Sequence, residues 1–315
     1  MNTRERIGIV TCCYARDEHL VKATCASVRY FCPNVPLCIT VDGDLNIDRW
    51  ASVYNATVLY VRELACEDLK RVMLNSFFAK HAALFEGPFD RFVYLDSDAI
   101  FWGDLLSTID LVSHDFTVFG GNGKVDPIMI EKWMFSLQAM RQFDPGFRLL
   151  DHPYFCAGVY GARKQCIPKD RFLELAPMAL KDKALFTADD QSVINYLVFS
   201  EAQRGRLSYQ CVESFCHPSH FPKQDMDARF MQSWLQGPSH TPKEPLVLHF
   251  SGRKPVPLLG GINHKATFTF FRLQHCLFGN RSKFNAIATL MGEDLLSLGQ
   301  RAWRKMKRLF WNLGK

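Results

Sequence analysis

The fold of this chain is decided by the stretch Phe92-Val93-Tyr94-Leu95-Asp96-Ser97-Asp98-Ala99-Ile100-Phe101-Trp102. It opens with a short apolar run of the kind expected for a buried strand. Asp96 and Asp98 follow at the end of that strand, where unpaired carboxylates would be costly to bury. A divalent cation at the carboxyl edge of a sheet would satisfy both acids, and α/β ligand sites form at this edge. The pattern therefore predicts a metal site; a turn with solvated aspartates is the alternative for a bare Asp-x-Asp.

The composition is that of an ordinary globular protein. The 315 residues, 48% of them hydrophobic and 22% charged, allow one large domain or two closely joined ones. Eleven cysteines, an odd number, predict reduced and mostly buried thiols rather than a disulfide framework. The first residues lead directly into an expected strand, so we expect no signal peptide and a cytoplasmic location. Cys211, Cys216, His217 and His220 fit no zinc spacing well, and we expect a structural loop there.

The net charge of +6 is concentrated at the C-terminus. The last fifteen residues contain no acid, and residues 1–300 carry equal numbers of acidic and basic side chains; the tail's basic residues are Arg301, Arg304, Lys305, Lys307, Arg308 and Lys315. Trp303, Met306, Phe310 and Leu313 recur at helical spacing, which predicts a basic amphipathic helix suited to the surface of an anionic membrane. A terminal helix packed on the core is the alternative. No other basic stripe favours nucleic acid.

The remaining pattern alternates strands with helices. Strands are expected at residues 7–12, 36–41, 57–61, 91–95, 154–160 and 246–250, and helices at 19–30, 76–85, 126–143 and from Asp189 or Asp190 to 199. This order predicts an α/β fold with a mostly parallel sheet covered on both faces. We assign residues 1–282 to this domain and residues 283–315 to a helical tail that anchors it peripherally to the inner face of the cytoplasmic membrane.

Four segments in order carry a resemblance to a known family. They are Tyr94-Leu95-Asp96-Ser97-Asp98 with Gly103-Asp104-Leu105, then Cys156-Ala157-Gly158-Val159, then Asp190-Gln191-Ser192-Val193-Ile194-Asn195, and finally His249-Phe250-Ser251-Gly252-Arg253-Lys254-Pro255. Together they resemble the family-eight glycosyltransferases, which include bacterial lipopolysaccharide galactosyl- and glucosyltransferases and glycogenin. The resemblance spans residues 7–256 in outline. It implies a GT-A fold, a Rossmann-like nucleotide-sugar-binding domain with a mostly parallel sheet and flanking helices.

The resemblance implies a role for each matching residue. Asp96, Asp98 and His249 would bind Mn²⁺ or Mg²⁺, with Ser97 between the acids. Gly252 would let the backbone approach the diphosphate of a UDP-sugar, and Lys254 would neutralise it, with Arg253 as a rival because the segment is one residue shorter than usual. The base would be lined by Thr11, Cys12, Tyr14 and Asp17.

The sugar end of the implied site contains Lys80, Asp190 and Gln191. Asp190 and Gln191 match the acidic and amide pair that the family places beside the sugar, and they are the predicted catalytic residues. Lys80 lies near the position of a basic residue that points toward the donor. Cys156 stands where the family usually has asparagine, and a thiol is a weak hydrogen-bonding group, so sugar recognition should differ.

The implied activity is metal-dependent transfer of a hexose from a nucleotide sugar to a glycan or a lipid-linked acceptor, with retention, as in lipopolysaccharide or other glycan biosynthesis. A front-face reaction is favoured over a double displacement; inversion would need a base such as Asp151, Asp189 or Asp190. A sugar-phosphate nucleotidyltransferase is one alternative, although residues 11–16 lack its glycine-rich loop. An inactive, membrane-associated carbohydrate-binding protein on a GT-A scaffold is the other.

Overall fold

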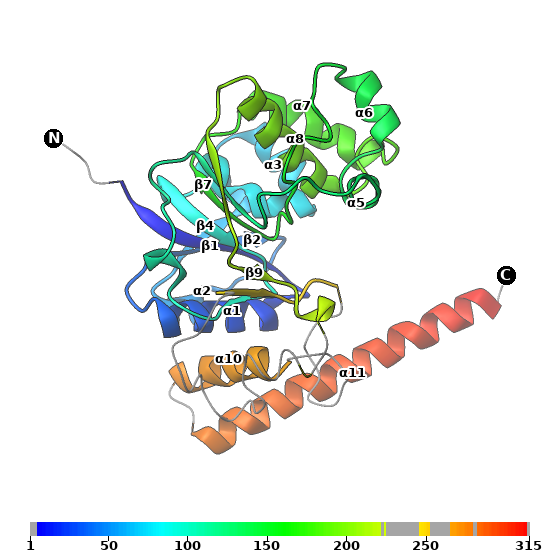
Figure 1. The fold of residues 1–315 in the computed structure, drawn as a ribbon. Helices are drawn as coiled ribbons and strands as arrows, with labels where there is room; N and C mark the ends of the chain where they lie inside the picture. Colours follow the sequence, from blue (N-terminus) through cyan, green and yellow to red (C-terminus); the bar gives the residue numbers. More distant parts are fainter. Residues whose placement is uncertain (1–4, 222–223, 225–245, 253–264, 280–281, 314–315) are drawn as a thin grey trace.

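A central sheet of seven strands organises the molecule (Figure 1). The computed structural model describes residues 5–221, 224, 246–252, 265–279 and 282–313. The strand order is β3-β2-β1-β4-β7-β6-β8. The strands are β1 (Ile7–Tyr14), β2 (Leu37–Asp42), β3 (Thr57–Tyr60), β4 (Arg91–Leu95), β6 (Phe116–Phe119), β7 (Val159–Arg163) and β8 (Tyr209–Val212). β7 is antiparallel to both neighbours and the other pairings are parallel, so the predicted mostly parallel sheet is confirmed.

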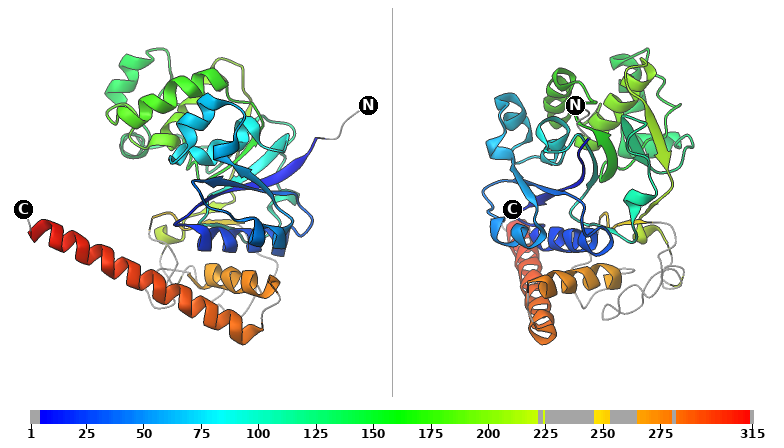
Figure 2. Two further views of the ribbon diagram at one scale, coloured as in Figure 1. Left: turned by 180° about the vertical axis from the view of Figure 1, so that it is seen from behind. Right: turned by 90° about the vertical axis from the view of Figure 1, so that its left-hand side faces the viewer.

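Helices cover both faces of this sheet. Alternate residues of β1 divide between the two hydrophobic cores: Ile9 and Cys13 face one core, and Val10 and Cys12 face the other. α1 (Glu18–Phe31) and α10 (Lys265–Phe278) pack in the first core, while α3 (Glu67–Met73), α7 (Lys169–Lys181) and α8 (Asp189–Gln203) pack in the second. Figure 2 shows the same layers from two further directions.

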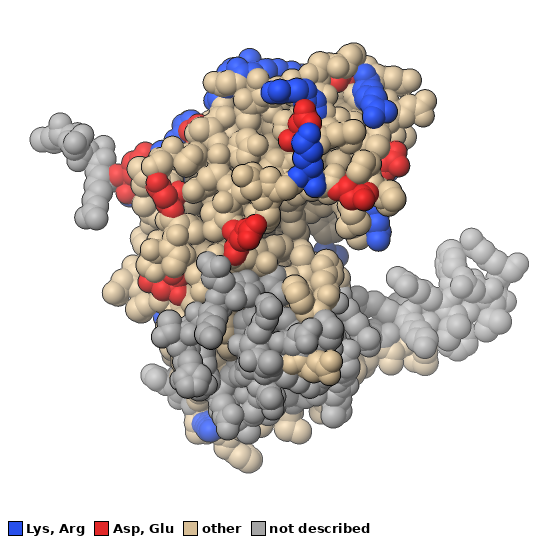
Figure 3. Space-filling model, in the orientation of Figure 1, with Lys and Arg blue, Asp and Glu red and all other residues tan. Residues whose placement is uncertain are grey.

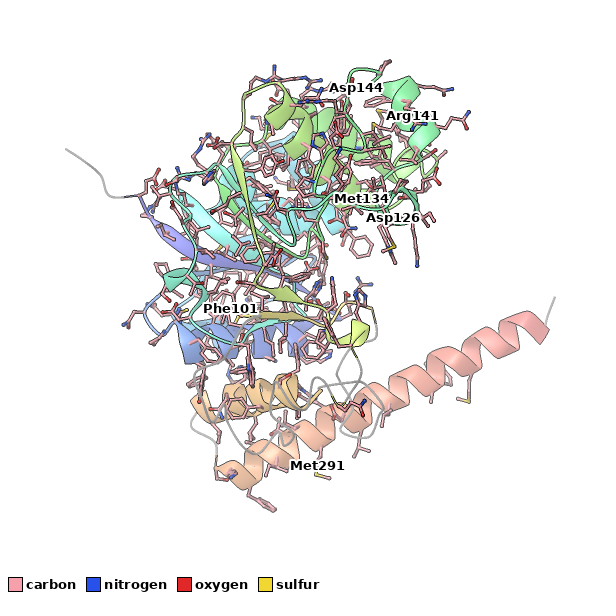
Figure 4. The ribbon with its side chains drawn as sticks, in the orientation of Figure 1. Phe101, Asp126, Met134, Arg141, Asp144 and Met291 are labelled. Carbon is pink, nitrogen blue, oxygen red and sulfur yellow. The ribbon has the colours of Figure 1, made fainter. Side chains whose placement is uncertain are left out.

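A small second sheet continues directly from the acidic segment. Its strand order is β5-β10-β9, where β5 is Ala99–Phe101, β10 is Val247–His249 and β9 is Phe215–Cys216. β5 and β10 are antiparallel, with His249 opposite Ala99. Figure 4 places Phe101 of β5 below the central sheet. This pairing carries His249, 151 positions beyond Asp98 in the chain, back to the acidic pair.

Two predicted helices are different in the structure. Residues 76–85 do not form one helix: a 3-10 turn spans Phe77–His81, and α4 (Ala83–Glu86) follows. Residues 126–143 form α5 (Pro127–Trp133) and α6 (Leu137–Phe143). The break occurs because Phe135 bridges Phe186, and the backbone of Ser136 donates to Leu185 instead of continuing the helix. Likewise, the strand predicted from residue 154 begins only at Val159.

The C-terminal part of the described chain is one long helix, α11 (Lys283–Leu313). Its first turns pack on α10, where Leu273 and Cys276 contact Ala286 and Leu290. Buried Arg272 reinforces this contact through ion pairs with Glu293 and Asp294, at 2.9 and 2.7 Å. Beyond these turns the helix extends away from the body (Figure 1). Among the described residues, the one α-helix not yet mentioned is α2 (Asp48–Ala51).

The helices and the surface charge of the described residues can be compared with the predicted membrane and nucleic-acid partners. None of the described helices combines the length and apolarity required to cross a bilayer. On the face shown in Figure 3, acidic and basic side chains are interspersed over the described surface, without an extended stripe of one sign. The described cysteines are free thiols, most of them buried, as predicted.

Candidate metal centre

Asp96, Asp98 and His249 converge at the end of β4. His249 Nε2 lies 3.2 Å from Asp98 Oδ1 and 3.6 Å from Asp96 Oδ2. One ligand atom from each of the three residues falls within 4.8 Å of the others. Asp98 and His249 are buried, while Asp96 borders a cleft. Two carboxylates and one imidazole around a small space form a donor set suited to Mn²⁺ or Mg²⁺, so these residues fit the implied metal.

The close approach of the three ligands depends on Gly158. Its carbonyl accepts a 2.7 Å hydrogen bond from the backbone of Asp96. A Cβ atom at this position would lie 2.4 Å from His249 Cε1 and 2.6 Å from Asp96 Oδ2. Any side chain would therefore force two of the three ligands to move.

Gly158→Ala is expected to weaken Mn²⁺ binding by about ten-fold or more, because it displaces metal ligands. It should also lower the free energy of unfolding by about 1–3 kcal/mol through overpacking. Calorimetric Mn²⁺ titration and thermal unfolding measure the two effects. Gly123→Ala is the matched control, since a Cβ there meets nothing within 4 Å. Unchanged Mn²⁺ affinity in Gly158→Ala would refute the steric argument.

The electrostatics of His249 point to a site that holds positive charge. Burial alone would lower the pKa of its imidazole, but Asp98 and Cys156 raise the pKa well above its usual value. Cys156 Sγ lies 3.6 Å from His249 Nδ1. Burial would raise the pKa of the Cys156 thiol, yet His249 and His217 together lower it to about 6.

A buried ion network adjoins the candidate metal ligands. Lys80 Nζ lies 2.8 Å from Asp190 Oδ2 and 3.5 Å from Asp96 Oδ1, so it links the predicted catalytic acid to the metal site. His81 Nε2 lies 3.2 Å from the same oxygen of Asp190. Burial opposes ionisation of Asp190, but Lys80 and His81 lower the pKa of its carboxyl below the usual value. Tyr94 donates a 2.8 Å hydrogen bond to Asp96 Oδ1.

A cleft of about 360 Å³ opens beside these charges. Eight of the described residues line this cleft: Tyr14, Arg16, Asp17, Phe77, Lys80, Asp96, Ser97 and Asp98. Tyr14 and Phe77 meet edge to face, and the Arg16 guanidinium lies 5.9 and 5.5 Å from their ring centroids. The cleft is thus lined by aromatic and cationic side chains and by the acidic pair of the candidate metal centre.

The other predicted residues occupy different places. Thr11 and Cys12 are buried in β1 behind Tyr14, and Thr11 Oγ1 has no hydrogen-bond partner among the described residues. Gln191 binds backbone: it accepts from Ala157 N at 3.2 Å and donates to Trp133 O at 3.0 Å. Gly252 has a left-handed backbone with φ of 81°. Lys254 and its rival Arg253 lie outside the described residues.

Two of the three bases considered for inversion form ion pairs elsewhere. Asp151 pairs with Lys124 at 2.6 Å, and Asp189 pairs with Lys183. Asp190 is the buried member of the set and the one joined to the metal ligands through Lys80. Asp17 occupies the position before α1, but its side chain makes no capping hydrogen bond.

Sequence reasoning missed His81, Tyr94, Gly158 and His217. Tyr94 lies in a buried apolar strand, where its sequence context gives no indication that its hydroxyl contacts Asp96. Gly158 lies in one of the four segments that carry the resemblance, but its steric role is visible only once the fold brings His249 beside it. The sequence groups His217 with Cys211, Cys216 and His220 in an expected structural loop; in the structure its ring lies 4.8 Å from that of His220 and it also meets Cys156 and His249.

The likeness of this chain to known proteins lies in its fold alone. No protein-family model and no curated protein sequence matches the chain. The fold is similar to that of the galactosyltransferase LgtC in complex with donor and acceptor sugar analogues, with a TM-score of 0.55 and 17% identity over 84% of this chain and 95% of that chain.

Two further glycosyltransferase structures are similar. For GlyE of Streptococcus pneumoniae the TM-score is 0.54 at 14% identity, covering 88% of this chain and 63% of that one. For the bifunctional glycosyltransferase WbbM the values are 0.53 and 15%, covering 91% and 52%. Each matches the α/β order of layers described above, with a mostly parallel sheet between helices. The chain has the GT-A fold of glycosyltransferases.

Proposed function

We propose that this protein is a metal-dependent glycosyltransferase that moves a hexose from a nucleoside diphosphate sugar, a UDP-sugar by resemblance, to a glycan or lipid-linked acceptor. The observation that carries the proposal is the convergence of Asp96, Asp98 and His249 beside a cleft, lined by the two acids, in a GT-A fold. A purely structural turn would not need a buried imidazole between two carboxylates.

The aromatic end of the cleft suits the nucleoside. Tyr14 offers a ring face for stacking on uracil, and Arg16 adds positive charge near the same ring. Asp17 would complete the base pocket, and Thr11 and Cys12 would support it from behind Tyr14. Because Tyr14 and Asp98 line one cleft, a base at one end and a diphosphate at the other would fit a single extended ligand.

Asp96, Asp98 and His249 would hold Mn²⁺ or Mg²⁺ against the diphosphate. When bound, such an ion neutralises charge that develops on the leaving phosphate. Ser97 lies between the two acids at the cleft wall. The left-handed backbone of Gly252 would admit a phosphate without a side chain, and Lys254 would supply further positive charge.

Asp190 would act on the sugar directly, and Gln191 would act through the loop that it holds. The ion pairs to Lys80 and His81 keep Asp190 ionised and fixed, so that it can stabilise positive charge at the anomeric carbon. Gln191 holds Ala157 and thus the loop before β7 in place. In the front-face reaction we propose, the bond from the anomeric carbon to the phosphate oxygen breaks. The acceptor oxygen bonds to the same face, and its proton passes to the departing phosphate.

The tail supports a membrane-linked acceptor. Past its contact with α10, α11 exposes Leu295, Leu296 and Trp303, which are 63%, 70% and 57% accessible. The sequence of this half is basic, which suits an anionic surface on the cytoplasmic side. We propose peripheral binding there, as part of lipopolysaccharide or other glycan synthesis.

Truncation after residue 298 is expected to reduce partitioning onto phosphatidylserine vesicles on the order of 10⁴-fold, since it removes six basic residues and each contributes about 1 kcal/mol. The retained part of α11 keeps Ala286, Leu290 and Asp294 on α10, so the body should unfold at the same temperature. Sedimentation with these vesicles and with neutral phosphatidylcholine vesicles provides the test. Equal binding of the truncated and full chains would refute the membrane proposal.

Hydrolysis of a panel of nucleotide sugars tests the activity. The full chain is incubated with UDP-, GDP- and ADP-hexoses, with Mn²⁺ or with excess chelator. Slow release of the sugar from one donor, dependent on Mn²⁺, supports a transferase. Binding of a donor without turnover in any condition would favour the inactive carbohydrate-binding alternative. Release of pyrophosphate from a nucleoside triphosphate and a sugar phosphate would favour the nucleotidyltransferase.

A further inference from the structure

A second group of metal-binding side chains meets His249 from its other side. Cys156, His217 and His249 each offer one ligand atom, and these atoms lie within 4.8 Å of one another. His249 reaches the two groups with different ring nitrogens: Nε2 faces Asp98, and Nδ1 faces the thiol of Cys156. The mechanism proposed above uses neither Cys156 nor His217.

The chemistry of this group differs from that of the acidic pair. One thiol and two imidazoles form a soft donor set, which selects Zn²⁺ over Mg²⁺ or Mn²⁺. Zn–S and Zn–N bonds of about 2.3 and 2.0–2.1 Å separate sulfur and nitrogen by about 3.6 Å in a tetrahedral site. Cys156 Sγ and His249 Nδ1 are 3.6 Å apart.

Both histidine rings have hydrogen-bonding neighbours of the kind that orient zinc ligands. His217 Nδ1 lies 2.9 Å from Ser251 Oγ and 3.3 Å from the carbonyl oxygen of His249. Asp98 lies against the far nitrogen of His249 at 3.2 Å. Carboxylate and carbonyl contacts of this kind orient metal-bound imidazoles.

Sharing of His249 couples the two sites. A neutral imidazole has one nitrogen that accepts and one that donates. With a hard cation on Nε2, Nδ1–H points at Cys156; with a soft cation on Nδ1, Nε2–H points at Asp98. His249 therefore serves one metal at a time.

We propose that Cys156, His217 and His249 form a zinc site that withdraws His249 from the Asp96–Asp98 site, so that Zn²⁺ antagonises binding of Mn²⁺. Water completes the coordination of the zinc. The binding part of this proposal is independent of the proposed function. The expectation that Zn²⁺ inhibits sugar transfer rests on the proposed function.

Cobalt substitution of the reduced full chain tests the zinc site. Co²⁺ bound to a thiolate gives a charge-transfer absorption band in the near ultraviolet, and Zn²⁺ should abolish that band by displacement. Cys156→Ser and His217→Ala should each lose the band and weaken Zn²⁺ binding by more than about 100-fold. Cys66→Ser, at another partly buried cysteine, should retain both. Thermal unfolding of each variant verifies that it is folded.

Competition with Mn²⁺ tests the coupling. One equivalent of Zn²⁺ should raise the free Mn²⁺ signal in electron paramagnetic resonance at least ten-fold for the native chain, and should have no effect in Cys156→Ser. Asp96→Asn should weaken Mn²⁺ binding yet keep the cobalt–thiolate band. A band that persists in Cys156→Ser, or Mn²⁺ affinity unchanged by bound zinc, would overturn the proposal. Absence of any nucleotide-sugar turnover would instead count against the proposed function alone.

Discussion

Asp98→Asn should lower kcat/KM for sugar transfer by at least about 100-fold and abolish measurable Mn²⁺ binding. The substitution replaces a charged oxygen ligand by a neutral amide of the same shape. Asp98 is 1% exposed, and its Oδ1 lies 3.2 Å from His249 Nε2, so the substitution removes charge from an oxygen that faces the imidazole. The backbone carbonyl of Asp98, which accepts from Phe250 at 2.9 Å, is unaffected, and the fold should persist.

Steady-state transfer kinetics and Mn²⁺ titration provide the measurements, with circular dichroism to verify the fold. Asp170→Asn is the matched control, because Asp170 is an exposed aspartate in the first turn of α7. It should retain native activity. An Asp98→Asn enzyme with native Mn²⁺-dependent turnover would defeat the proposed role of the acidic pair.

Asp190→Asn should both destabilise the protein and slow transfer. Loss of this buried carboxylate leaves Lys80 paired only with Asp96, at 3.5 Å, among the described residues. Removing one partner of a buried pair costs about 3–5 kcal/mol, and loss of charge beside the sugar should reduce kcat by about 100-fold. Chemical denaturation and transfer kinetics measure the two effects.

The pH dependence separates this role from simple packing. The folded-state pKa of Asp190 lies below its ordinary value of 3.8. Its contribution to stability is therefore present above that value and is lost as the pH falls through the lowered pKa. The native chain should lose this increment below about pH 4, and Asp190→Asn should not.

Asp189→Asn is the matched control for its neighbour. Asp189 is partly buried, pairs with exposed Lys183 and has φ of 37°, a conformation that asparagine tolerates. The change should cost at most about 1 kcal/mol and leave kcat near native. If Asp189→Asn, and not Asp190→Asn, abolished transfer, the catalytic role of Asp190 would be wrong and an inverting reaction would be favoured.

Local sequence pattern was sufficient for the central strands. β1, β2 and β4 are buried on both faces and therefore read as continuous apolar runs, and β10 is a short apolar run that ends at a histidine. The acidic pair could be predicted because two carboxylates follow directly after such a run. His249 came from the resemblance, since nothing local ties it to a segment so distant in the chain.

Tertiary contacts decided what the pattern missed. Residues 126–143 look continuously helical, but the bridge from Phe135 to Phe186 takes over the backbone hydrogen bonds at the break. His81 lies beside Lys80 in a 3-10 turn, and only the fold brings Asp190 to both of them. The proximity of Cys156 to His217 likewise could not be predicted, because the fold brings both of them to His249.

A crystal structure of the chain with Mn²⁺ and UDP is the most direct measurement of the metal-centre claim. Anomalous scattering at the manganese edge should give a peak within bonding distance of Asp96, Asp98 and His249 Nε2. Both phosphates of UDP should lie beside that peak, with the uracil on Tyr14. A manganese peak remote from these three side chains, or UDP bound outside the cleft, would contradict the account.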